Sequence, residues 1–458
     1  MGLLLCGFSL ILLQLVLNWH LGPVLHSSEL PWLLVSCTAL LGQALGYGWR
    51  SRKWPAIFLV LTLFAPVLAS QIRNCQGGAW TTLLLSASLA LTTSFPLSHL
   101  VACYWHWQAN ASIRTFYRRE LLGVLSALVL TLALGPIRST LIFPWGVVLA
   151  AWSLHSRLSR AFLLVLATLA SLSLSGARQQ GARSAFPGAT LVAQEVSPYQ
   201  YVEVVDTAAG RFLFLNGLCH YGPPAYKQLN TYLAQIPARR LPDSARRAGC
   251  LVLGAGTFVA PALVAEQGLE TTVIELDPAV VKLGIEYFQQ SRPAGDHFQI
   301  TTGDARVLLR RHPPVGLVVI NLPSPYSLNV ASLFTQEFFR EVRGKLVPGG
   351  VCSVFLGAPL DPAGANSVQG PILAALQTAF PHSLAISSRS CDNTVVYSSS
   401  DPLGSLQELR RDLRAHGQNR FTLYSREQLE GLTRGIAPAS LNDLSLCAAL
   451  NRTLWMQP

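Results

Sequence analysis

The chain has 458 residues, of which 50% are hydrophobic and only 12% are charged, and its formal net charge at pH 7 is +11. A soluble enzyme of this length is rarely so apolar, so the composition excludes a purely soluble globular chain. The positive charge does not indicate nucleic-acid binding, because the arginines are dispersed among loops and helix ends, where membrane-flanking charge explains them.

The apolar excess lies in residues 1–175, which predict a transmembrane domain of about seven helices. Several of these segments are shorter than the roughly 20 residues that a perpendicular span needs. The fifth and sixth are therefore candidates for a tight hairpin. The expected spans are 3–17, 30–48, 55–70, 81–105, 121–135, 141–154 and 161–174.

Basic residues are concentrated in the loops that follow the second, fourth and sixth spans. By the positive-inside rule, this pattern places the amino terminus in the cytoplasm. Seven spans would then place everything after Leu174 outside, which conflicts with an enzyme that uses a cytosolic nucleotide. The side of the membrane on which residues 176–458 lie is thus open. The basic residues are Arg50, Arg52, Lys53, Arg114, Arg118, Arg119, Arg157 and Arg160.

Residues 176–188 form a linker, and residues 189–245 predict a small β region with strands near 190–195, 199–205 and 212–216. From 246 to 400, apolar runs alternate with helical segments, which predicts a mostly parallel, doubly wound α/β sheet. The tail, 401–458, has helical patches at 407–415 and 426–432. The expected sheet strands lie near 250–253, 271–275, 297–301, 315–320 and 351–356, with a late edge strand at 394–398.

The most informative stretch runs from Cys250 to Pro278. A short apolar strand ends in Gly254-Ala255-Gly256, a helix follows, and a second strand ends in Glu275. Glycines at such a turn let the backbone approach a ligand, and an acid about 20 residues later can bind a ribose diol. Asp304 follows the next strand, so two acids at successive strand ends predict a nucleoside pocket. The structural alternative is that both carboxylates interact with helix N-termini.

Seven segments in order resemble the polyamine aminopropyltransferases (spermidine synthases), in particular their membrane-fused bacterial members. They are SPYQYVEV, LFLNGLCHYG, LVLGAGTF, VIELDP, TTGDARVLL, NLPSPYSLN and LFTQEFFREVRGKLVPGGV. The resemblance implies a Rossmann-like domain of the S-adenosylmethionine methyltransferase type. It also implies an S-adenosyl-type nucleotide cofactor, either decarboxylated S-adenosylmethionine or S-adenosylmethionine. The implied nucleotide-binding positions are Gln200, Gly254, Gly256, Thr257, Glu275 and Asp304.

The amine side of the site departs from the family. Thr257 stands where the family has an aspartate for the donor's ammonium group, and Asn321 and Ser324 stand at the two aspartates of the catalytic loop. A hydrogen bond to a charged group contributes about 1.5 to 3 kcal/mol, so these losses would impair aminopropyl transfer severely. Tyr226 matches a family tyrosine, and His220 is a candidate substitute base whose alternative reading is structural.

Three functions follow from this pattern. The first is a membrane-bound spermidine synthase-like protein, an aminopropyltransferase by ancestry that is impaired in that reaction. The second is an S-adenosylmethionine-dependent methyltransferase. The third is a non-catalytic binding or assembly module.

The expected partners are the lipid bilayer, an amine substrate, and membrane proteins or a second copy of the chain. The resemblance implies a multi-pass location in a bacterial inner membrane. The nine cysteines form no metal or disulfide framework, so no metal is expected.

Overall fold

The computed structural model describes residues 2–21, 29–48, 56–72, 79–107, 113–154, 162, 164–173, 188–223, 225–254, 256–288, 298–325, 327–361, 368–391 and 393–443. The expected linker, most of the expected basic loops and the end of the tail lie outside these ranges. The chain divides into two compact units. One contains residues 1–192, 216–218 and 455–458, and the other contains residues 193–215 and 219–454. We call them the helical unit and the α/β unit.

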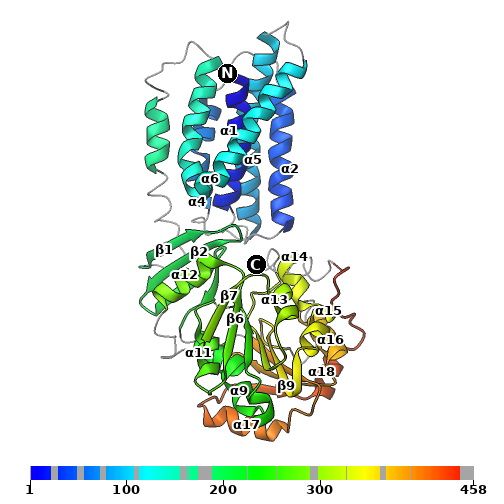
Figure 1. Cartoon of the computed structure of the whole chain (residues 1–458). Helices are drawn as coiled ribbons and strands as arrows, with labels where there is room; N and C mark the ends of the chain where they lie inside the picture. Colours follow the sequence, from blue (N-terminus) through cyan, green and yellow to red (C-terminus); the bar gives the residue numbers. More distant parts are fainter. Residues whose placement is uncertain are drawn as a thin grey trace. The chain divides into compact units, whose positions relative to one another are not determined.

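Long apolar helices build the helical unit (Figure 1). Among the described residues, Thr81–His99 is the one segment long and apolar enough to cross a membrane, and the other apolar stretches are shorter. A single such segment is weak evidence for spanning. The helices are α1 (Gly2–Leu21), α2 (Glu29–Gly48), α3 (Ala56–Leu63), α4 (Ala65–Ile72), α5 (Ala79–Trp107) and α6 (Ile113–Leu154), and residues 164–173 are also helical.

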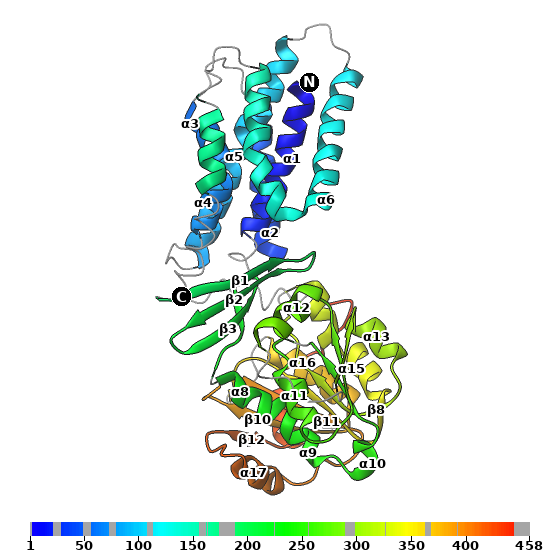
Figure 2. The same ribbon diagram turned by 60° about the vertical axis from the view of Figure 1, so that its left-hand side comes forward.

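Helix α6 covers both the fifth and the sixth expected spans. A side-chain methyl at Gly123 would lie 2.0 Å from the Leu4 carbonyl oxygen, and one at Gly146 would lie 3.1 Å from Ser9 Oγ. Both points contact the same end of α1, although a straight helix would separate residues 123 and 146 by about 35 Å. The chain of α6 therefore turns back between them, as Figure 2 shows.

Glycine brings α2 and α5 into backbone contact. A side-chain methyl at Gly42 would lie 2.4 Å from the Leu91 carbonyl oxygen, and one at Gly46 would lie 2.3 Å from that of Phe95. Gly42 and Gly46 form a G-x-x-x-G pair, the spacing that lets apolar helices pack closely without large side chains between them.

The small β region is a four-stranded sheet in the order β1-β2-β3-β4. Its strands are β1 (Thr190–Val196), β2 (Tyr201–Thr207), β3 (Gly210–Leu215) and β4 (Leu218–Tyr221). Strands β2 and β3 pair antiparallel across the Ala208-Ala209 turn, with Thr207 opposite Gly210. The fourth strand was not expected from the sequence.

The main sheet has eight strands in the order β12-β10-β11-β9-β8-β5-β6-β7. The five strands from β9 to β7 are parallel, whereas β11 runs antiparallel to both β9 and β10. This is the doubly wound, methyltransferase-type sheet that the resemblance implies. The strands are β5 (Cys250–Leu253), β6 (Thr271–Glu275), β7 (Phe298–Thr302), β8 (Val315–Ile320), β9 (Leu346–Phe355), β10 (His382–Ser388), β11 (Asn393–Ser399) and β12 (Thr422–Tyr424).

Helices cover both faces of this sheet. Successive side chains of a strand point to opposite faces, so the central strands are buried under helices on both faces. Leu251 and Leu253 pack on the face that carries α15 and α16, whereas Cys250 and Val252 pack on the face that carries α11. The helices are α8 (Ala225–Asn230), η1 (Thr231–Gln235), α9 (Ile236–Arg240), α10 (Asp243–Arg246), α11 (Val259–Ala265), α12 (Pro278–Tyr287), α13 (Ala305–Arg311), α14 (Leu328–Ala331), η3 (Ser332–Phe334), α15 (Gln336–Arg343), α16 (Gln369–Ala379), α17 (Leu406–Ala415) and α18 (Arg426–Leu432).

One expectation about the sheet is wrong. The late strand, expected at the edge, is β11, and it lies between β9 and β10. Its partner β10 was missed because it contains three serines among its seven residues. Their hydroxyl groups find partners inside the protein, as when Ser383 Oγ lies 2.9 Å from Ser398 Oγ of β11.

Candidate functional site

The register of the parallel strands brings the predicted nucleotide positions to one edge of the sheet. Leu253 pairs with both Ile274 and Ile320, so Gly254, Glu275 and Asn321 follow three adjacent strand positions. Glu275 pairs in turn with Thr302, two residues before Asp304. These residues occupy the carboxyl edge where the strand order reverses between β5 and β8, which is where doubly wound sheets bind ligands.

The glycine turn after β5 is tightly packed at Gly254 but open at Gly256. Gly254 has φ +90°, and a side-chain methyl there would lie 2.3 Å from the Asn321 carbonyl oxygen. Gly256 has φ +52°, but no atom lies within 4 Å of its methyl position. Glycine at 254 is thus required both by conformation and by contact, whereas at 256 only the conformation favours it. The next two residues, Thr257 and Phe258, are buried.

Glu275 is buried at the end of β6, and its Oε1 accepts a hydrogen bond of 3.1 Å from the Asp277 amide. Asp277 is fully buried and caps α12, since its Oδ1 accepts from the Ala279 amide at 2.9 Å. The cap explains why α12 begins at Pro278, directly after the acid.

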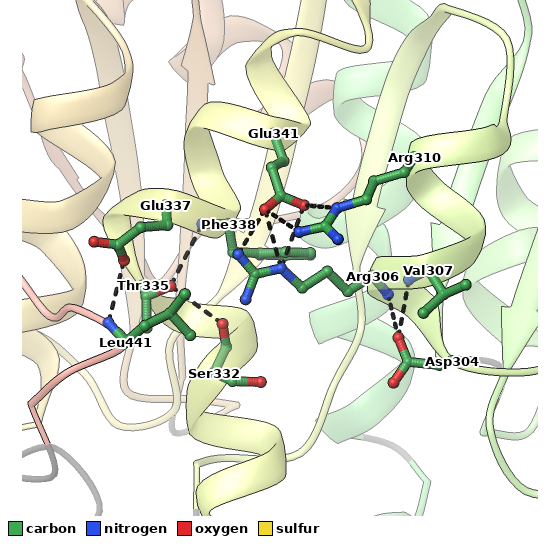
Figure 3. A network of polar contacts seen from close by, with 10 residues as sticks. All are labelled: Asp304, Arg306, Val307, Arg310, Ser332, Thr335, Glu337, Phe338, Glu341 and Leu441. Atoms are coloured by element: carbon green, nitrogen blue, oxygen red, sulfur yellow. Dashed lines mark hydrogen bonds and ion pairs between the residues drawn. The ribbon is translucent and has the colours of Figure 1, made fainter.

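Asp304 caps α13, because its Oδ1 accepts from the amides of Arg306 and Val307 at 2.8 and 2.9 Å (Figure 3). This is the structural alternative that the sequence left open for Asp304. The capping oxygen is Oδ1, and the residue as a whole is exposed. A cap and a ligand contact are therefore compatible in the same carboxylate.

A clamp of three charged residues holds α13 against α15 (Figure 3). Glu341 of α15 accepts from Arg306 Nη2 at 2.5 Å and from Arg310 Nη2 at 2.8 Å. Burial raises the pKa of Glu341, but the hydrogen bonds and charges of the two guanidinium groups outweigh it and hold this pKa at about 2. Because Arg306 is two residues from Asp304, the clamp also fixes the start of α13.

Gln200 lies in the turn between β1 and β2, and Ser197 organises that turn. Ser197 Oγ accepts hydrogen bonds from the amides of Tyr199 and Gln200 at 3.1 and 3.0 Å. The same hydroxyl lies 2.7 Å from Asp277 Oδ2. The structure therefore brings the Gln200 turn to the loop that carries Glu275.

The three positions where the family has aspartates are also at this edge. Asn321 follows β8 directly, and Thr257 follows the glycine turn. Ser324 Oγ lies 3.5 Å from the methyl position of Gly357, which follows β9. All three side chains are uncharged, so they can offer hydrogen bonds but no negative charge to a cationic amine.

His220 lies on β4, at the far end of the small sheet from β1. Burial of the ring lowers the pKa of His220 to about 4, so the imidazole is neutral at physiological pH. The Tyr226 hydroxyl donates to the Cys219 carbonyl oxygen at 2.8 Å. This bond gives Tyr226 a structural role in supporting β4.

Two residues that the sequence did not single out belong to the site region, Ser197 and Asp277. Both lie inside the segments that carry the resemblance, and the Asp-Pro pair before α12 is a readable capping signal. The Ser197–Asp277 contact joins residues 80 positions apart, so no local pattern could reveal it. Among the described residues, no group of three or more metal-ligating side chains is present.

Comparisons with known proteins cover part of the chain. No family model matches. A polyamine aminopropyltransferase of Corynebacterium efficiens is 27% identical over 203 residues, which is 42% of this chain and 38% of that protein. An N-terminal histidine N-methyltransferase of Emericella nidulans is 25% identical over 199 residues, which is 36% of this chain and 34% of that protein. The chain thus spans little more than a third of the length of these relatives.

Among solved structures, a probable spermidine synthase from Corynebacterium glutamicum matches with a TM-score of 0.42 and 18% identity. The match covers 54% of this chain and 95% of that one.

Proposed function

Because its C-terminal part belongs to the polyamine aminopropyltransferase (spermidine synthase) family, we propose that this chain is a membrane-embedded transferase whose α/β unit binds an S-adenosyl-type nucleotide. We further propose that it catalyses aminopropyl transfer to diamines weakly or not at all. The proposal of a nucleotide site rests on the convergence of Gly254, Glu275 and Asp304 on one edge of the sheet.

The chemistry of these groups suits a nucleoside. Glu275 offers carboxylate oxygens to a ribose diol, and the glycine turn lets backbone amides approach the ligand closely. Asp304 offers an acceptor at the adjacent strand end while it caps α13. Gln200, on the turn held by Ser197, supplies an amide that can both donate and accept.

Calorimetry with methylthioadenosine tests this proposal. We expect binding to the full-length protein in detergent, and a loss of affinity of about tenfold or more in Glu275→Ala and Asp304→Asn. Asparagine is chosen at 304 because it retains the cap. Glu270→Ala is the matched control, because Glu270 is an exposed acid at the amino end of β6. Equal affinities in all four proteins would refute the placement of the site.

The low aminopropyl transfer is supported by the uncharged side chains of Thr257, Asn321 and Ser324. Losing the carboxylates that bind a diamine would weaken binding roughly 10²- to 10⁴-fold, and losing the base would slow transfer by a further factor of about 10² to 10⁴. We expect little spermidine from decarboxylated S-adenosylmethionine and putrescine.

The triple variant Thr257→Asp, Asn321→Asp, Ser324→Asp should exceed wild type in this assay. Since Thr257 is 4% exposed, a carboxylate there is desolvated in the free protein, and the double variant at 321 and 324 is the control for folding. Wild-type turnover of about 1 per second or more would contradict the proposal.

Methyl transfer is the second candidate. S-adenosylmethionine carries a carboxylate that an aspartate at position 257 would repel, and Thr257 removes that repulsion. The similarity to a histidine N-methyltransferase points the same way. A clear preference for S-adenosylhomocysteine over methylthioadenosine in the same calorimeter would favour this reaction. Binding of neither would leave the non-catalytic module as the function.

Insertion in a bilayer is supported by the surface of the helical unit. Large apolar side chains are exposed along its helices, among them Leu33, Leu84, Leu121, Val129 and Leu172 at 57 to 65% exposure. Such surfaces are rare in water-soluble monomers and are the rule where lipid is the solvent.

The proposed topology has the amino terminus in the cytoplasm. Reporter fusions at Arg52, Arg118 and Arg157 should all report the cytoplasmic side. A fusion after Arg183 decides the location of the α/β unit. A cytoplasmic signal there would contradict seven spans, and an external signal would contradict the use of a cytosolic nucleotide.

A further inference from the structure

A chain of buried polar contacts links the small sheet to the loop that carries Glu275. Ser197 follows β1, and its hydroxyl lies 2.7 Å from Asp277 Oδ2. The Asp277 amide in turn donates to Glu275 Oε1 at 3.1 Å. Ser197 is 6% exposed, Asp277 0% and Glu275 9%, so water contributes little to these contacts. Buried polar groups of this kind are held tightly, because a lost partner cannot be replaced by solvent.

The Asp277 carboxylate does more than cap a helix. A cap needs one oxygen, and Oδ1 fills that role at the Ala279 amide. The second oxygen, Oδ2, accepts from Ser197. The hydroxyl has a single proton, and it lies 3.2 Å from the Gln200 carbonyl but 2.7 Å from the charged carboxylate, so the carboxylate is the preferred acceptor.

The other side of Ser197 Oγ holds the turn that presents Gln200. Its lone pairs accept from the Tyr199 and Gln200 amides, which fixes the backbone of that turn. Ser197 thus orients a residue from the small sheet, while Asp277 orients one from the main sheet. Two further polar contacts tie the small sheet to α12, from Lys282 to Glu195 at 2.7 Å and from Arg211 to the Tyr287 carbonyl at 3.1 Å.

From this geometry we infer that Ser197 and Asp277 are positioning residues that set the distance between Gln200 and Glu275, and so determine nucleoside affinity without touching the nucleoside. The inference rests on the proposed nucleotide site. It predicts that part of the effect of Ser197 on affinity depends on Glu275, which a role in folding alone does not predict.

The first experiment measures methylthioadenosine affinity of the full-length protein in detergent. Ser197→Ala should weaken binding about tenfold, the order expected when one hydrogen bond to a charged group is lost, and Ser197→Thr should restore most of it. In the Glu275→Ala background, Ser197→Ala should cause a smaller loss than in wild type, because only its effect on Gln200 remains. Independent, multiplicative losses would overturn the inference.

Ser405→Ala is the matched control. Ser405 caps α17 in a capping box, and α17 packs beside β12 at the opposite end of the sheet order from β7. This variant should lower the melting temperature but leave the affinity unchanged. An equal loss of affinity in both serine variants would show a general effect of destabilisation and would overturn the inference.

Hydrogen exchange on the unliganded protein separates this inference from the proposed function. In Ser197→Ala, exchange should rise in residues 198–201 and also in residues 275–280 across the contact. A rise confined to 198–201 would refute the link, whether or not methylthioadenosine binds. If exchange rises in both segments but the wild type binds no nucleoside, the proposed function fails while the structural link stands.

Discussion

The clamp between α13 and α15 yields a prediction whose size and pH dependence follow from the structure. Glu341→Gln removes the charge that both guanidinium groups share but keeps the shape of the side chain. The ordinary pKa of a glutamate is 4.5, and in the folded protein that of Glu341 is about 2. This difference corresponds to at most about 3 to 4 kcal/mol of folding free energy. Arg310 is 59% exposed, so solvent screening reduces our expectation to about 2 kcal/mol.

A depressed carboxylate pKa contributes stability that is fully present above pH 4.5 and is lost as the pH falls toward 2. At pH 7, Glu341→Gln should therefore lower the melting temperature of the α/β unit by roughly 4 to 8 °C. Its difference from wild type should be unchanged at pH 5 and should narrow steadily below pH 4.5.

Differential scanning calorimetry of the full-length protein between pH 3 and 8 measures this difference. Glu430→Gln is the control, because Glu430 belongs to an exposed pair four residues from Arg426 on α18 and should shift the melting temperature by less than about 1 °C. A Glu341→Gln effect as small as the control, or one that is constant from pH 5 to 3, would refute the reasoning.

Three further predictions concern the glycines and His220. Gly254→Ala should destabilise the α/β unit by at least about 2 kcal/mol, because the added methyl would lie 2.3 Å from a backbone oxygen. Gly256→Ala should destabilise it only by the conformational strain of about 1 to 2 kcal/mol. Equal losses of thermal stability in the two variants would contradict this prediction. Gly46→Leu should disrupt the packing of α2 on α5 and lower the yield of folded protein in detergent, and Gly48→Leu, with no atom within 4 Å of its methyl position, should not. With a pKa of about 4, His220 does not titrate between pH 5.5 and 8.5, so methylthioadenosine affinity should follow the same pH profile in wild type and His220→Gln.

The strands of the main sheet are predictable from the sequence where an apolar run ends at a glycine or a polar residue of the site. β5 ends before Gly254, β6 ends at Glu275, and both match their expected bounds, as does β8 before Asn321. Helices α12 and α13 begin directly after Asp277 and Asp304, which cap them. These signals are local, so the sequence contains them in full.

Pairing between distant segments is what the sequence does not contain. β12 was missed because its three residues pair with β10, about 35 residues earlier in the chain, whereas β10 was missed because of its three serines. In the site, the residue types at the strand ends were predictable from the sequence. That Asp304 caps α13 with Oδ1 and still has an acceptor for a ligand was not predictable. The link from Ser197 to Asp277 was also hidden, because it forms only after two sheets come together.

Phe258, directly after the glycine turn, has consequences for how this region can evolve. Its backbone is left-handed, with φ +62°, and its ring is buried. A methyl added at Gly284 of α12 would lie 2.7 Å from that ring and 2.9 Å from the Gly256 carbonyl. Position 284 can therefore gain a side chain only if position 258 becomes smaller and the Gly256 carbonyl also shifts. The residues at these two positions are therefore expected to change together in evolution. A chimera that replaces the glycine turn with that of a relative should also replace residue 284.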